Sequence, residues 1–150
     1  MNTGEADLVI SIYKKLLNYG VNSKYMAILT PYSKQVATIK SLVGDKNLPL
    51  VDVSTVDGIQ GREKECIIIS MVRSNSKREI GFLKDWRRMN VAVTRARRML
   101  ILVGNIECVT ADKYINALKQ WIEEHGHISS AQEWRDDEEV RFGLGASDKI

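Results

Sequence analysis

The sequence has no apolar run that approaches the roughly 20 residues needed to cross a lipid bilayer. Its first residues, MNTGEAD, are too polar for a secretory signal peptide. Internal repeats and low-complexity tracts are also absent from the sequence. These absences argue against a membrane-spanning, secreted or repeat protein, so we expect an intracellular protein, cytoplasmic or nuclear, without a membrane partner.

Cysteine is scarce, with only Cys66 and Cys108 in the chain. Both lie within or just beyond apolar runs, and no secretory signal accompanies them. We therefore expect two reduced packing residues, and neither a disulfide nor a metal site.

Charge is distributed unevenly along the chain. The length of 150 residues and the ordinary composition suit a single domain. Residues 1–110 hold 17 Lys and Arg against 10 Asp and Glu, a net charge of +7. Residues 62–98 alone hold 11 against 4, again a net +7. A positive segment of this kind suits a surface that binds a polyanion, although a merely soluble surface has a similar composition.

Apolar periodicity predicts alternating helices and strands. The predicted helices span 2–20, 33–43, part of 85–98, and 112–124, with Asn2 and Glu5 as a capping box, Gly20 as a stop and Ser33 as a cap. The predicted strands span 26–29, 50–55, 66–72 and 99–103, and a short strand is possible from His127. Residues 127–150 form an acidic tail that we expect to be partly ordered or disordered.

Short strands with continuous apolar runs that alternate with helices indicate an α/β fold with a parallel sheet and helices on both faces. In such folds the loops that follow the strands gather at one edge of the sheet, where ligands bind. We expect these loops at 30–32, 55–63, 73–75 and 104–105. The strand 99–103 is expected to be buried on both faces because its apolar residues are continuous.

Five arginines lie within residues 87–98, directly before this strand. Arg88 and Arg95 are seven positions apart and would share one face of a helix. A guanidinium held between a helix and a buried strand suits a phosphate that gains charge during a reaction. The alternative is a solvated basic helix end.

The stretch STVDGIQGRE, residues 54–63, joins two strands without a helical apolar pattern. Gly58 and Gly61 would leave backbone amides free to hold phosphate oxygens, and Thr55 adds a hydroxyl. Gln60 can donate and accept hydrogen bonds, and Glu63 can accept one from a ribose hydroxyl. Taken alone, the same stretch is more typical of a plain strand connection.

Four segments occur in one order: TPY at 30–32, VSTVDGIQGREKE at 53–65, SMVRSN at 70–75 and RRMNVAVTRAR at 87–97. Together they resemble motifs IV, V and VI of superfamily-1 helicases, in the branch of the nonsense-mediated-decay RNA helicase and the immunoglobulin-mu-binding helicase. The resemblance covers about residues 2–105 and implies that residues 1–126 are the second RecA-like domain of such a protein.

The resemblance also implies roles for individual residues. Arg95 matches the arginine finger that reaches the γ-phosphate. Glu63 matches the acidic residue that binds the ribose, and Gln60 and Gly61 match residues beside the nucleotide. Residues matched to the single-strand surface are Thr30, Pro31, Tyr32 and Thr55, with Arg73 and Asn75 as weaker candidates that could equally lie in a solvated loop. Arg88 and Arg97 are matched to supporting positions.

The sequence lacks a G-x-x-x-x-G-K-[ST] loop and an Asp-Glu pair after a strand. ATP would therefore be held mainly by a first RecA-like domain, with the Mg²⁺ ligands outside this chain and no metal site within it. We expect the sequence to begin at a domain boundary and the chain alone to be inactive.

The implied function is part of an ATP-dependent 5′-to-3′ helicase, an ATP hydrolase that acts on single-stranded RNA or DNA. Two alternatives remain: a free-standing nucleic-acid-binding module without nucleotide chemistry, and a protein-interaction module that uses the acidic tail. The sequence does not distinguish RNA from DNA, because backbone contacts carry no base information.

Overall fold

The structure is a computed structural model that describes residues 3–55, 58, 64–71, 96–104, 113–130 and 134. In chain order the elements are α1 (Thr3–Asn18), η1 (Ser23–Tyr25), β1 (Met26–Thr30), α2 (Ser33–Asp45), β2 (Asp52–Thr55), β3 (Lys64–Ser70), β4 (Ala96–Val103) and α5 (Lys113–His125). No described helix has the length and apolarity required to cross a membrane.

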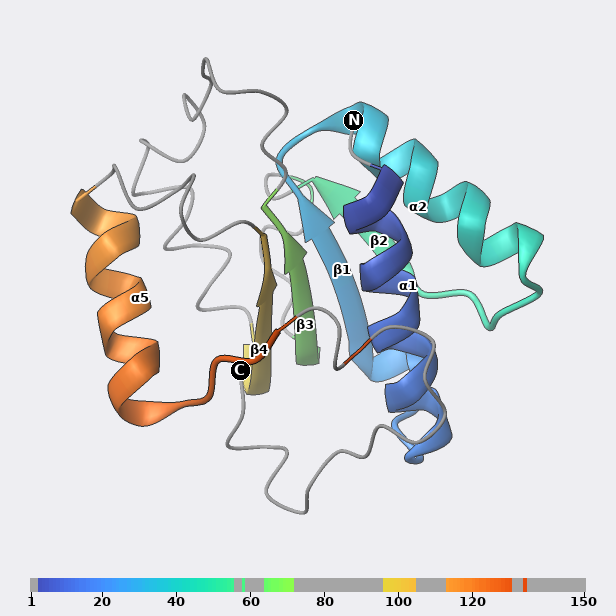
Figure 1. The fold of residues 1–150 in the computed structure, drawn as a ribbon. Coiled ribbons are helices and arrows are strands. Elements are labelled where there is room, and N and C mark those ends of the chain that lie inside the picture. Colours follow the sequence, from blue (N-terminus) through green and yellow to red (C-terminus); the bar gives the residue numbers. More distant parts are fainter. Residues whose placement is uncertain are drawn as a thin grey trace.

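The four strands form one sheet in the order β2-β1-β3-β4, and all three neighbouring pairs are parallel (Figure 1). The predicted parallel α/β fold is therefore confirmed. Every strand begins at one edge of the sheet, here called the N-terminal edge, and ends at the opposite C-terminal edge. This arrangement decides which residues far apart in the sequence can meet.

The two inner strands, β1 and β3, form the centre of the core. All five residues of β1 are buried, and so are Cys66–Ser70 in β3. Their apolar runs are continuous because each strand has a neighbour on both sides and is covered on both faces.

β4 differs from its prediction in two ways. It begins at Ala96, three residues before the predicted start, because the start of β3 supplies pairing partners that an apolar pattern does not reveal. It is also less buried than expected: Ile101 and Val103 are buried, whereas Leu100 and Leu102 are only half-buried. Among the described strands β4 pairs with β3 alone, so it lacks the cover that an inner strand receives.

α1 buries the apolar stripe that the sequence predicts, which consists of Leu8, Val9, Ile12, Tyr13 and Leu16. The Tyr13 hydroxyl donates a hydrogen bond of 2.6 Å to the carbonyl oxygen of Pro49 and so ties the helix to the segment before β2. Gly20 has a φ of +97°, the left-handed conformation expected of a helix stop.

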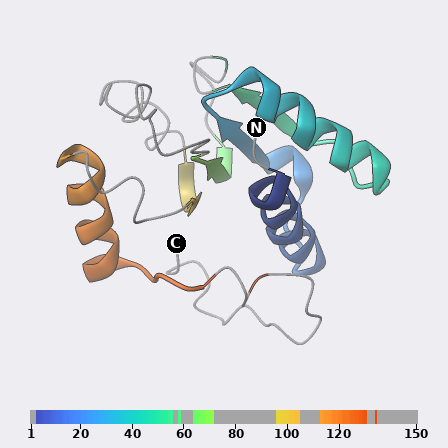
Figure 2. The ribbon, with the colours of Figure 1, turned by 45° about the horizontal axis from the view of Figure 1, so that its top comes forward.

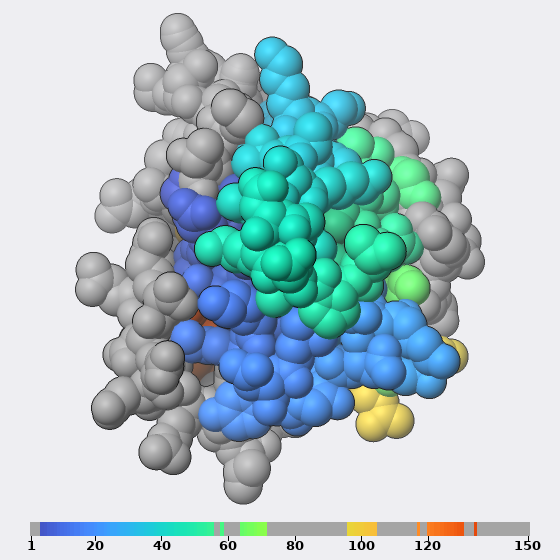
Figure 3. Space-filling view, turned by 90° about the vertical axis from the view of Figure 1, so that its right-hand side faces the viewer, coloured from blue at the N-terminus to red at the C-terminus, as the bar shows by residue number. Residues whose placement is uncertain are grey.

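α2 lies beside α1, and both helices lie on the same side of the sheet (Figure 2). Figure 3 shows the surface that they form together, with α2 in teal and the α1 segment in blue. Ser33 is the first helical residue and not the cap as predicted; Tyr32 occupies the cap position and makes no side-chain capping hydrogen bond. Gln35, Ile39 and Val43 are the buried residues of α2.

α5 lies beyond β4, on the other side of the sheet from α1 and α2 (Figure 2). Ile122 on this helix is buried as predicted, while the side chains of Tyr114, Ile115 and Leu118 lie outside the described part. The short strand predicted from His127 is absent, since residues 127–130 have no regular structure. Most of the acidic tail, residues 131–133 and 135–150, also lies outside the described residues.

Candidate functional site

The C-terminal edge brings together strand ends that carry predicted site residues. Thr30 and Thr55 are Cα partners at the ends of β1 and β2, and Ser70 and Val103 are partners at the ends of β3 and β4. The Thr30 side chain is fully buried, and its Oγ1 has no hydrogen-bond partner among the residues that the structure describes. Tyr32, also predicted to contact the nucleic-acid strand, is half-buried and therefore more accessible than Thr30.

Thr55 shapes the turn that follows β2. Its Oγ1 accepts a hydrogen bond of 3.3 Å from the amide of Gly58. A Cβ added to Gly58 would come within 3.3 Å of the Ser54 Cβ, closer than most real contacts of this kind. A glycine at position 58 therefore permits this close approach to the end of β2.

The stretch from Thr55 to Lys64 connects opposite edges of the sheet. Thr55 ends β2 at the C-terminal edge, and Lys64 begins β3 at the N-terminal edge. The loop of residues 55–63 is predicted to lie at the C-terminal edge, and the structure places its first residue, Thr55, there. Residues 56, 57 and 59–63 of this predicted loop lie outside the described residues.

The N-terminal edge brings β3 and β4 together at their first residues, because Lys64 and Ala96 are Cα partners. Lys64 directly follows Glu63, and Ala96 directly follows Arg95. Glu63 and Arg95 themselves lie outside the described residues, as do Gln60, Gly61, Arg73, Asn75 and Arg88. Of the predicted site, the structure describes Thr30, Pro31, Tyr32, Thr55 and Arg97.

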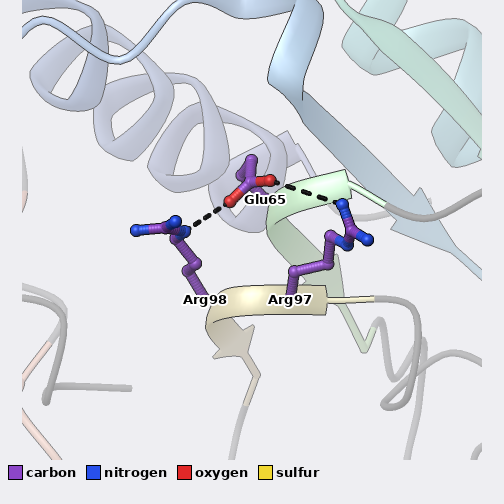
Figure 4. Close-up of polar contacts among 3 residues, drawn as sticks. All are labelled: Glu65, Arg97 and Arg98. Carbon is purple, nitrogen blue, oxygen red and sulfur yellow. Dashed lines mark ion pairs between the residues drawn. The ribbon is translucent and has the colours of Figure 1, made fainter.

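Arg97 was expected in the Arg-rich helix but lies in β4, together with Arg98. Both arginines make ion pairs with Glu65 of β3 (Figure 4). Arg98 Nε lies 2.7 Å from Glu65 Oε1, and one terminal guanidinium nitrogen of Arg97 lies 3.8 Å from Oε2. Glu65 is not among the site residues predicted from the sequence, where its only signal is a carboxylate two residues after Glu63.

Further positive charge gathers near the start of β3. The Lys64 ammonium donates a hydrogen bond of 3.2 Å to the carbonyl oxygen of Lys24, which precedes β1. The Lys24 ammonium in turn lies 5.2 Å from the centre of the Tyr25 ring, a cation–π distance. In Figure 3, residues of β4 (yellow) are visible at the lower right of the molecule. Two lysines, Lys24 and Lys64, therefore add positive charge at the edge where Arg97 and Arg98 pair with Glu65.

The described residues contain no cluster of three or more metal-ligating side chains. Cys66 is a free, buried thiol, as predicted. Burial raises the pKa of Cys66 to about 12, which keeps the thiol protonated and unreactive near neutral pH.

A sequence model of the AAA domain family matches residues 1–107. The chain is 44% identical over 130 residues to the DNA polymerase alpha-associated DNA helicase A of Saccharomyces cerevisiae, covering 85% of this chain and 19% of that protein. It is 40% identical over 136 residues to the DNA-binding protein SMUBP-2 of Mesocricetus auratus, covering 91% and 14%. It is also 45% identical over 124 residues to the Regulator of nonsense transcripts 1 of Dictyostelium discoideum, covering 79% and 9%.

The chain thus spans less than a fifth of the length of each of these relatives. The family match nevertheless covers well over half of the chain and includes the whole described sheet. The chain belongs to the AAA domain family, in the superfamily-1 helicase branch related to SMUBP-2 and the Regulator of nonsense transcripts 1.

Proposed function

We propose that residues 1–126 form the second RecA-like domain of an ATP-dependent 5′-to-3′ helicase. In this proposal the domain supplies the arginine finger Arg95, a ribose contact from Glu63, and part of a single-strand binding surface. ATP would be held mainly by a first RecA-like domain of the same protein, and the Mg²⁺ ligands would belong to that domain. The names of the relatives, which include ATP-dependent and DNA helicases, support the proposal.

The observation that carries the proposal is the pairing of Lys64 with Ala96. Glu63 and Arg95 are covalently attached to these partners, so the two residues with proposed nucleotide roles enter the sheet at neighbouring positions of one edge. They are 32 positions apart in the sequence, and the parallel β3–β4 pair brings together the residues that directly follow them, Lys64 and Ala96. A site that contacts both the ribose and the γ-phosphate of one nucleotide needs such proximity.

Separate edges would then serve separate ligands. The N-terminal edge beside Glu63 and Arg95 would face the nucleotide, and the C-terminal edge with Tyr32 and Thr55 would face the nucleic-acid strand. ATP binding would close the two domains on each other, and hydrolysis would release them, which moves the protein along the strand. Strand binding would be directed to the backbone and weakened by salt.

The finger assignment is tested in the protein that carries this domain together with a P-loop domain. We expect Arg95→Ala to lower strand-stimulated ATP turnover by about 10³-fold or more, because the variant loses charge stabilisation on the γ-phosphate. Arg95→Lys should also be slow, since a lysine lacks the planar fork of donors. Lys40→Ala, an exposed site on α2, is the control and should retain parental turnover.

Turnover of Arg95→Ala within a few-fold of the parent would refute the proposal. Binding of a single strand with no ATP turnover by the parent itself would instead favour a nucleic-acid-binding module without nucleotide chemistry.

A further inference from the structure

Glu65 is held by two arginines that are consecutive in the chain, Arg97 and Arg98 (Figure 4). In a regular strand, consecutive side chains point to opposite faces of the sheet, so one carboxylate meets only one of them. The distances of 3.8 Å and 2.7 Å to the two carboxylate oxygens therefore require a local departure from regular geometry.

The sheet register shows this departure. Lys64 pairs with Ala96, but Cys66 pairs with Met99, so the single residue Glu65 stands opposite both Arg97 and Arg98. Two residues opposite one is the arrangement of a β-bulge. Bulges bend the strand and redirect side chains, and they are frequent next to active sites.

The position of this cluster within the chain is as important as its geometry. Glu65 lies two residues after Glu63, and Arg97 lies two residues after Arg95. The cluster of Glu65, Arg97 and Arg98, here called the Glu65 clamp, therefore joins the two chain segments that lead to the proposed nucleotide contacts.

The ion pairs of the Glu65 clamp add little to the stability of the whole fold. The side chains of Arg97 and Arg98 are 60% and 80% exposed, and that of Glu65 is 34% exposed. Solvent screens ion pairs of such exposure, and they contribute little to the free energy of unfolding. Two ion pairs from one carboxylate at a bulge do, however, constrain the path by which the chain enters β4.

We propose that Glu65 is a positioning residue: by holding Arg97 and Arg98 at the bulge, it fixes the start of β4 and thereby the approach of Arg95 to the γ-phosphate. This inference rests on the proposed role of Arg95. It assigns Glu65 no direct contact with the nucleotide.

The test compares Glu65→Gln with the parent protein that contains both domains, at saturating single strand. Glutamine keeps the size of the side chain and removes the charge that holds both guanidinium groups. We expect kcat for ATP hydrolysis to fall by about 10- to 100-fold, the usual cost of a misplaced catalytic group. The KM for ATP and the melting temperature should stay close to those of the parent. Glu124→Gln, an exposed carboxylate on α5, is the matched control and should retain the parental kcat.

Two further variants show whether Glu65 acts through the clamp and through Arg95. The exchanged pair Glu65→Arg/Arg98→Glu should recover most of the kcat that Glu65→Arg alone loses. In the Arg95→Ala background, Glu65→Gln should cause less than about a three-fold further loss, because coupled residues are not additive.

The outcomes separate the two proposals. If Arg95→Ala is slow but Glu65→Gln keeps the parental kcat, the clamp proposal fails and the finger assignment stands. The clamp proposal also fails if the kcat loss of Glu65→Gln comes with a large fall in melting temperature, because Glu65 then has a structural role. It fails likewise if the losses caused by Glu65→Gln and Arg95→Ala are fully additive. If Arg95→Ala keeps parental turnover, the proposed function fails and the clamp proposal fails with it.

Discussion

The buried hydroxyl of Ser70, at the end of β3, donates a hydrogen bond of 2.5 Å to Glu5 Oε2 in the first turn of α1. The sequence suggested a capping role for Glu5, but this bond also anchors the start of α1 to the C-terminal edge of the sheet. Ser70 begins the SMVRSN segment, so the anchor holds α1 next to a segment matched to the nucleic-acid surface.

We expect Glu5→Ala to lower the free energy of unfolding by about 1–3 kcal/mol, because the buried Ser70 hydroxyl loses its acceptor. Asp7→Ala, an exposed carboxylate on the same helix, should change the free energy by less than about 0.5 kcal/mol. Urea denaturation of the two variants measures the difference. Equal effects would show that the Glu5–Ser70 hydrogen bond does not anchor α1.

Alanine substitutions at two glycines, Gly20 and Gly44, should change the free energy of unfolding in opposite directions. No atom lies within 4 Å of a Cβ added at Gly20 or Gly44. Gly20 has a φ of +97°, so Gly20→Ala should destabilise the fold by about 1 kcal/mol through backbone strain. Gly44 is helical in α2, so Gly44→Ala should stabilise it by about 0.5–1 kcal/mol. Thermal unfolding of both variants tests the pair, and a shift of the same sign in both would contradict it.

Tyr32 and Tyr25 lie beyond opposite ends of β1 and allow a test of the proposed nucleic-acid edge. In the protein with both RecA-like domains, Tyr32→Ala should weaken binding of a single strand by about ten-fold, the usual effect of losing one aromatic contact. Tyr25→Ala, at the N-terminal edge, should leave strand affinity unchanged. Fluorescence anisotropy with a labelled oligonucleotide at fixed salt measures both. A larger loss for Tyr25→Ala would reverse the assignment of the edges.

The buried Cys66 thiol should make the fold less stable in alkaline solution. Its pKa is raised from 9.0 to about 12 in the folded chain by burial, so above pH 9 the unfolded chain loses this proton first. The protonated thiol makes its full contribution to the free energy of unfolding below pH 9. This contribution is lost as the pH rises toward 12, with a slope of up to about 1.4 kcal/mol per pH unit. Burial also raises the pKa of Tyr13, which adds a loss of the same sign above pH 10.

Cys66→Ala isolates the contribution of the thiol to this decline. The free energy of unfolding of the variant should fall less steeply with pH above 9 than that of the parent, whatever its value at pH 7. Urea denaturation at a series of pH values checks the slope. Identical slopes for parent and variant would show that the thiol does not titrate differently in the folded and unfolded chain.

The apolar pattern of the sequence determined the fold class and most of the elements. Apolar runs predicted the inner strands at 26–29 and 66–72, and the helical stripe from Leu8 to Leu16 predicted α1. These features are readable because burial on one face or two imposes a local period on the residues themselves. The motif order in the same sequence was enough to identify the helicase branch.

Tertiary pairing decided what the local pattern could not contain. The early start of β4, the pairing of Lys64 with Ala96 and the bulge that lets Glu65 meet Arg97 and Arg98 depend on which strand lies beside which, and in what register. The placement of Thr30 and Thr55 at one edge of the sheet and of Arg97 near the other follows from the parallel direction of every strand. Such relationships join residues distant in the sequence, so no window along the chain records them.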